Sequence, residues 1–158
     1  AGLVLRGVSA PDQILKTQQE RIQNPDRISR FAFVMPALSA DPEVRNAFFT
    51  SLFEEKNRAR EPWVLEALRY IHHPLRARSS ESYIRPGLDL LEEIQRTGDI
   101  FFPKGWLDAT LGGHQTETAA DIVRDFLADH PDYPPRLRAK ILQSADTLFR
   151  AARINRRK

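Results

Sequence analysis

Residues 24–63 read NPDRISRFAFVMPALSADPEVRNAFFTSLFEEKNRAREPW, and three prolines in this stretch follow a side chain that can accept a hydrogen bond. These pairs are Asn24-Pro25, Asp41-Pro42 and Glu61-Pro62, and each is followed by an apolar-periodic run of helical length. Proline suits the first helical position because its missing N–H would have no partner there, and the preceding residue suits the cap. The starts are 17 and 20 residues apart. Two helices with their turns therefore occupy roughly 40 residues, the length of one HEAT-like unit.

The rest of the chain continues this pattern. A first helix is expected after Ser9-Ala10-Pro11, and later starts are expected at Phe102-Pro103, Thr116 and Pro134-Pro135. Leu88, Leu91 and Ile94 share one helical face, which predicts a single helix that ends at Thr97 with Gly98 as a left-handed cap. Alternating β-branched runs are absent. We therefore expect an all-α fold, a HEAT- or armadillo-like superhelix of antiparallel hairpins with about seven to nine helices.

Length and composition fit one soluble globular domain spanning residues 1–158. The net charge of +3 is small against 24 basic and 21 acidic side chains, and no apolar run approaches the roughly 20 residues needed to cross a bilayer. We accordingly expect no membrane partner. The start at Ala1-Gly2-Leu3, without an initiating Met or a basic leader, suggests a piece excised from a larger protein. The lack of cysteine leaves both the bacterial cytoplasm and the periplasm open as compartments.

No catalytic or metal-binding motif is found in the sequence. H-E-x-x-H, G-x-S-x-G, Walker and G-x-G-x-x-G patterns are all missing. His72 and His73 point about 100° apart on a helix, so they cannot hold one ion together, and we expect the histidines to cap helix ends or pack in loops. Glu92 and Glu93 resemble an acid/base pair only superficially, because they fall opposite the apolar face and are expected to be solvated. We predict no catalytic residue, no metal ligand and no cofactor in this chain.

A basic cluster near the C-terminal end could follow a phosphate backbone, as in helical solenoids that bind nucleic acid. It comprises Arg136, Arg138, Lys140, Arg150, Arg153 and Arg156 to Lys158. Asp125, Asp129, Asp132 and Asp146 dilute this charge, and no aromatic RNA-binding signature accompanies it. Nucleic acid is therefore the less favoured partner.

The stretch from Gly98 to Trp106, GDIFFPKGW, places three large aromatic side chains in and beside a Gly/Pro-rich connection. Such groups either tuck under neighbouring hairpins or anchor the domain to another surface. We expect Trp106 to lie in the core. Phe101 and Phe102 are the better anchor candidates, because in an extended segment before Pro103 adjacent side chains diverge. Arg76 and Arg78, after His73-Pro74, join these three aromatics as candidate interdomain residues.

Several runs carry a resemblance to a known family: EPWVLEAL (61–68), HHPLR (72–76), LLEEIQRTGDIFFP (90–103), YPPRLRAKILQ (133–143) and NPDR (24–27). Together they resemble the C-terminal helical domain of bacterial aminopeptidase N-family zinc metallopeptidases. The resemblance implies an α-superhelical domain that packs beside the catalytic domain of the same polypeptide and helps enclose the chamber for peptide substrates.

The zinc in that family belongs to the parent enzyme. Its H-E-x-x-H motif with the downstream Glu ligand, and its G-A-M-E-N substrate loop, have no match at any position here. No catalytic or zinc-binding residue is carried over to this chain. Two alternatives stay open: a free-standing helical-repeat adaptor that binds a protein, and a helical solenoid that binds nucleic acid.

Overall fold

The computed structural model describes residues 1–7 and 11–155, and these residues form helices and connections with no strand. The all-α prediction is confirmed. The α-helices are α1 (Gly2–Leu5), α2 (Pro11–Glu20), α3 (Pro25–Leu38), α4 (Pro42–Ser51), α5 (Glu61–Ile71), α6 (Ala77–Ser80), α7 (Ile84–Asp89), α8 (Leu91–Thr97), α9 (Phe102–Leu111), α10 (Glu117–Asp129) and α11 (Pro135–Asn155). Short 3-10 helices are η1 (Glu55–Arg58), η2 (Pro74–Arg76) and η3 (Glu81–Tyr83). The described α-helices outnumber the seven to nine expected, because α1 and α6 are single turns.

The predicted helix starts are largely confirmed. The Asn24 side chain accepts the N–H three residues later at 3.1 Å, and Asp41 accepts the N–H two residues later at 2.9 Å. Thr116 caps α10 in the same way, at 3.1 Å. The third start differs, because α5 includes Glu61 as its first residue and Arg60 before it makes no side-chain cap. The Glu61 carboxylate instead accepts a hydrogen bond from the Asp99 N–H.

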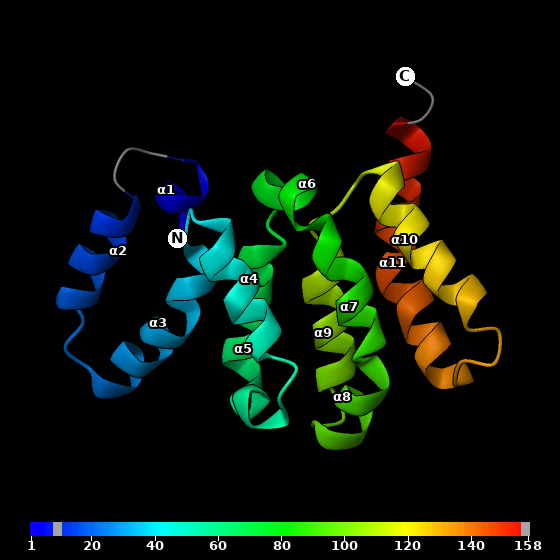
Figure 1. The fold of residues 1–158 in the computed structure, drawn as a ribbon, viewed down its shortest axis with the longest axis horizontal. Helices are drawn as coiled ribbons and strands as arrows, with labels where there is room; N and C mark the ends of the chain where they lie inside the picture. The colour runs from blue at the N-terminus through cyan, green and yellow to red at the C-terminus, as the bar shows by residue number, and fades with distance from the viewer. Residues whose placement is uncertain (8–10, 156–158) are drawn as a thin grey trace.

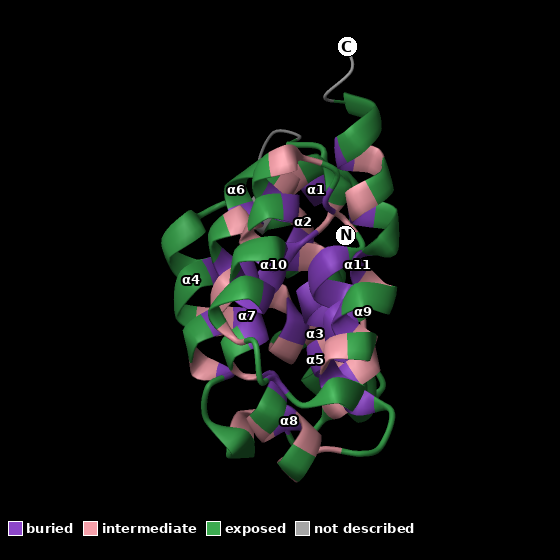
Figure 2. Cartoon of the chain, turned by 90° about the vertical axis from the view of Figure 1, so that its right-hand side faces the viewer, coloured by how far each residue is buried: buried purple, intermediate pink, exposed green. Residues whose placement is uncertain are grey.

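The longer helices lie side by side in two layers. One layer runs α3, α5, α9, α11, in which each helix contacts the next, and the other contains α4, α7 and α10 (Figures 1 and 2). Helix α4 packs on α3, α7 packs on α9 and α10, and α10 packs on α11. Helix α2 lies against α3 at one end of the row (Figure 1).

The segments coloured as buried lie mainly where the two layers face each other (Figure 2). Their apolar side chains form one contiguous cluster from α3 to α11. A smaller cluster of Val4, Leu5, Leu15 and Leu38 attaches α1 and α2, and Tyr70 packs against both clusters. Burial of such side chains contributes about 1.5–3 kcal/mol each relative to exposure. Among the described residues no helix is long and apolar enough to span a bilayer.

Two local predictions are wrong. The expected single helix around Leu88 and Ile94 breaks at Leu90 into α7 and α8. Gly98 is extended, with φ −96° and ψ 173°, so it is no left-handed cap. Glycine is required here because other side chains come close to its backbone. A Cβ at this position would lie 2.6 Å from the Phe102 ring and 3.1 Å from a Glu61 carboxylate oxygen. Of the predicted features, Ser9, Ala10 and the basic residues Arg156 to Lys158 lie outside the described residues.

Candidate functional site

The connection from Gly98 to Trp106 divides its three aromatic side chains between the core and the surface. Trp106 is fully buried in α9, and its indole N–H donates to the Gly87 carbonyl at 2.8 Å. The core position expected for Trp106 is confirmed. Phe102 is also buried and meets Trp106 edge to face, with ring centroids 6.0 Å apart.

The expectation that Phe102 precedes the helix in an extended segment is wrong. Phe102 is the first residue of α9, and Phe101 before it has helical φ and ψ values of −92° and −17°. The helical twist directs these neighbouring side chains about 100° apart. Phe102 therefore enters the core, whereas Phe101 is 78% exposed and Ile100 is 71% exposed.

Hydrogen bonds from backbone N–H groups to carboxylate side chains hold the turn that carries Ile100 and Phe101. The Asp99 N–H donates to the Glu61 carboxylate at 2.8 Å, which ties the connection to the start of α5. The Asp99 side chain in turn accepts the Phe101 N–H at 2.9 Å, an Asx turn that leads into α9. Ile100 and Phe101 are thus presented outward by a pinned turn.

A shallow groove lies beside this turn, between α8 and the beginning of α11. We call it the Phe101 groove, and it is lined by Glu92, Gln95, Arg96, Ile100, Phe101, Pro134, Arg136, Leu137 and Lys140. Its apolar part comes from two segments more than 30 residues apart in sequence. Arg96 and Arg136 are exposed, and Lys140 is half-buried and donates to the Gln95 amide oxygen at 2.8 Å.

The candidate arginines of the other connection lie elsewhere. Helix α6, which contains Arg78, is at the opposite end of the molecule from α8 (Figure 1). The Arg76 guanidinium donates to the carbonyls of Ala37 and Leu38 at 3.1 and 2.8 Å, and so holds the end of α3. Burial, with a smaller contribution from Arg45, lowers the pKa of Arg76. Arg78 is exposed, and the structure does not bring either arginine together with Phe101.

A buried histidine pair is the polar feature that sequence reasoning missed. His72 Nδ1 and His114 Nε2 are 2.8 Å apart, although the residues are 42 positions apart in the chain, and both side chains are 1% exposed. Burial lowers the pKa of His72 well below its usual range, and His114 lowers it further. Burial also lowers the pKa of His114, against an opposing effect of Glu81. Both rings are therefore neutral at pH 7, and one donates to the other.

The second nitrogen of each ring, His72 Nε2 and His114 Nδ1, is buried and has no hydrogen-bond partner among the described residues. In the described part of the chain, no group of three or more His, Cys, Asp or Glu side chains gathers around an ion-sized space. His73 caps η2 by accepting the Leu75 N–H, as expected for a histidine at a helix end. No local pattern signals the pair, since its partners come from separate helix ends.

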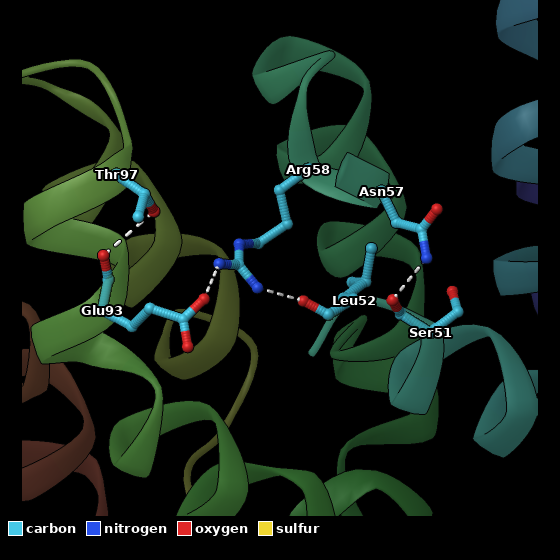
Figure 3. A network of polar contacts seen from close by, with 6 residues as sticks. All are labelled: Ser51, Leu52, Asn57, Arg58, Glu93 and Thr97. Carbon is cyan, nitrogen blue, oxygen red and sulfur yellow. Dashed lines mark hydrogen bonds and ion pairs between the residues drawn. The ribbon is translucent and has the colours of Figure 1, made fainter. Parts of the chain in front are cut away.

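A second buried polar contact involves Arg58, which is 3% exposed. Its guanidinium pairs with the Glu93 carboxylate and donates to the Leu52 carbonyl at 2.6 Å (Figure 3). Asn57 and Thr97 add further bonds to the backbone nearby (Figure 3). The expectation of two solvated glutamates is thus correct for Glu92 but wrong for Glu93, which links α8 to η1.

The basic cluster near the C-terminus is dispersed. Arg138 donates to the Leu127 carbonyl, and Arg150 pairs with Asp146 at 3.0 Å. Arg136 and Lys140 line the Phe101 groove, on a different part of α11 from Arg153, which lines a hollow beside α10. The described residues therefore do not form one continuous basic stripe.

Comparison with known proteins identifies no relative of this chain. No protein-family model, curated protein or solved structure matches the chain.

Proposed function

We propose that this chain is a non-catalytic accessory domain of a zinc-dependent aminopeptidase, and that its hairpins follow a HEAT-like superhelical path. On this proposal the domain packs against the catalytic domain of the same polypeptide and helps enclose the chamber for peptide substrates. The zinc and the groups that activate water belong to that other domain. The contribution of this chain is to restrict access and exclude bulk water.

The observation that supports this role best is the pinned pair Ile100 and Phe101. The pair lies within the longest run that resembles the aminopeptidase family, residues 90–103. Both side chains are mostly exposed on a turn whose backbone is held by hydrogen bonds. Large apolar groups held outward in this way are typical of interfaces, where they become anchors once a partner covers them.

The gene provides the first test. On the proposal, the open reading frame that encodes Ala1 continues upstream into a segment that contains H-E-x-x-H. A reading frame that starts near Leu3, or an upstream segment without this motif, would overturn the proposal.

Turnover of a peptide substrate by the full-length parent provides the second test. Phe101→Ser is expected to lower the turnover of the parent or its thermal inactivation temperature while the isolated domain keeps its melting temperature. Leu142→Ser is the matched control, since Leu142 is 45% exposed on α11 and does not line the groove. Equal behaviour of the two variants in the parent would show that Phe101 is no interdomain anchor.

A free-standing protein-binding adaptor is the second candidate, and the Phe101 groove supports it. The groove combines exposed apolar and cationic side chains, which a protein partner can cover. The upstream reading frame separates the two functions, because only the accessory domain requires a catalytic domain in the same chain.

A further inference from the structure

The apolar half of the Phe101 groove exposes side chains that an apolar side chain of a partner could cover. Ile100, Phe101 and Pro134 are exposed, and Leu137 forms the buried floor between them. Covering a large apolar side chain such as Phe101 removes apolar surface from water, which favours binding. Because hydrogen bonds already hold the turn, little conformational entropy is lost when a partner binds.

The polar half of the groove is cationic. Arg96, Arg136 and Lys140 line it against one carboxylate, that of Glu92. Within residues 1–7 and 11–155, none of these three cations forms an ion pair. Some exposed arginines elsewhere are neutralised by nearby carboxylates, as Arg124 is by Glu117 and Asp121, whereas Arg78 and Arg153 form no ion pair with the described residues.

The start of α11 adds to the positive potential. The first turn of this 21-residue helix contains no acidic residue and carries Arg136. Helix N-termini favour negative groups, so a cation here is unfavourable until an anion lies beside it. The same end of α11 provides Pro134 and Leu137 to the apolar half, which brings the two halves within reach of one short segment.

From these features we propose that the Phe101 groove binds an acidic segment of a protein partner that places one large apolar side chain between Phe101 and Leu137. Carboxylates of the segment pair with Arg96, Arg136 and Lys140. This inference goes beyond the accessory role, because it concerns the chemistry of the segment and holds whether the segment belongs to the same polypeptide or to a separate one. Nucleic acid is the weaker fit, because a phosphate backbone has no large apolar side chain to cover Ile100 and Phe101.

The test is a titration of the full chain with short blocked peptides, followed by NMR chemical-shift changes and calorimetry. The probe is acetyl-Glu-Asp-Phe-Leu-Glu-Asp-amide. Its matched controls have Lys in place of every acidic residue, or Ser in place of Phe and Leu. The acidic apolar peptide is expected to bind saturably and at least about ten-fold more tightly than either control, with an affinity that falls as salt rises.

Variants separate the two halves of the groove. Phe101→Ser is expected to weaken binding of the acidic peptide at least about ten-fold, and the double variant Arg96→Glu, Arg136→Glu is expected to reverse the preference toward the Lys peptide. Leu142→Ser and Arg153→Glu, which change exposed side chains outside the groove, are expected to leave the affinity unchanged.

Several results would overturn the proposal: equal binding of acidic and basic peptides, shift changes centred away from α8 and the start of α11, indifference to Phe101→Ser, or tighter binding of oligouridine than of the acidic peptide. These outcomes are independent of the upstream reading frame. A missing H-E-x-x-H motif with selective binding of the acidic peptide would overturn the accessory role alone, and the reverse combination would overturn the groove proposal alone.

Discussion

Replacement of Trp106 by Ala is the sharpest test of how α9 is held in the fold. The indole is fully buried, packs edge to face on Phe102 and donates its N–H to the Gly87 carbonyl at 2.8 Å. Deletion of a buried Trp side chain costs about 3–5 kcal/mol, and a carbonyl left without its donor adds up to about 1–3 kcal/mol. We expect Trp106→Ala to lower the free energy of unfolding by about 4 kcal/mol or more. For a domain of this size that corresponds to a fall in Tm of roughly 8–16 °C.

Urea and thermal unfolding, followed by circular dichroism at 222 nm, measure this change directly. Trp106→Phe keeps most of the apolar contact but removes the donor, so its expected cost is about 1–3 kcal/mol. Phe101→Ala is the matched control five residues earlier, and it should stay within about 0.5 kcal/mol of the parent chain because Phe101 is exposed. An unchanged urea m-value would show that the folded and unfolded ensembles remain comparable.

A cost of less than about 1 kcal/mol for Trp106→Ala would contradict this prediction, since the indole would then contribute little to the packing of α9 on α7. An equal cost for Phe101→Ala and Trp106→Ala would contradict it as well. That result would mean that Phe101 packs inside the isolated domain and is no exposed anchor.

Further predictions concern glycines, the histidine pair and the buried arginine. Gly113→Ala should destabilise the fold by about 3 kcal/mol in urea unfolding, because the added Cβ would lie 1.7 Å from the His72 carbonyl oxygen. Gly87→Ala should instead raise stability by about 0.5–1 kcal/mol in the same assay, since it lies inside α7 and its Cβ would have 3.5 Å or more of room; a loss of stability would contradict this. Burial lowers the pKa of His72 and of His114 below 6.5, so both rings must take up protons when the chain unfolds at lower pH. The free energy of unfolding should therefore keep the full contribution of the pair above pH 6.5. Below pH 6.5 it should decrease by at most about 1.4 kcal/mol per pH unit for each ring. Urea midpoints from pH 8 to 5 check this slope, and a His114→Gln variant with the same slope as the parent would refute it. Arg58→Met leaves the Leu52 carbonyl without its donor, so Tm should fall by an amount equivalent to about 1–3 kcal/mol, and an unchanged Tm would show that the contact is dispensable.

Much of the helical framework follows from local sequence. Asn24-Pro25, Asp41-Pro42 and Thr116 mark helix starts correctly, because capping depends on residues within one turn of each other. The expectation that Trp106 lies in the core is also confirmed. Such signals do not depend on the rest of the fold.

The exposed side chains of the candidate site could not be identified from the sequence, because they are set by contacts between distant segments. Phe101 faces solvent and Phe102 faces the core because of the turn that precedes them. This turn is held by a hydrogen bond from the Asp99 N–H to Glu61, which lies 38 positions earlier in the chain. The sequence suggested a helix cap for Glu61 and a left-handed cap for Gly98. Packing uses the first as a tether and the second to make room for the Phe102 ring.

Local residue patterns are enough to specify an all-helical chain and the places where most of its helices begin, because capping and apolar periodicity act over a few residues. The partners of the polar and exposed groups, by contrast, depend on how the helices pack. Helix packing brought His72 against His114, set Glu93 on the buried Arg58, and placed the start of α11 beside Phe101. These contacts join segments more than 30 residues apart, and the free energy that selects them comes from the packing of whole helices.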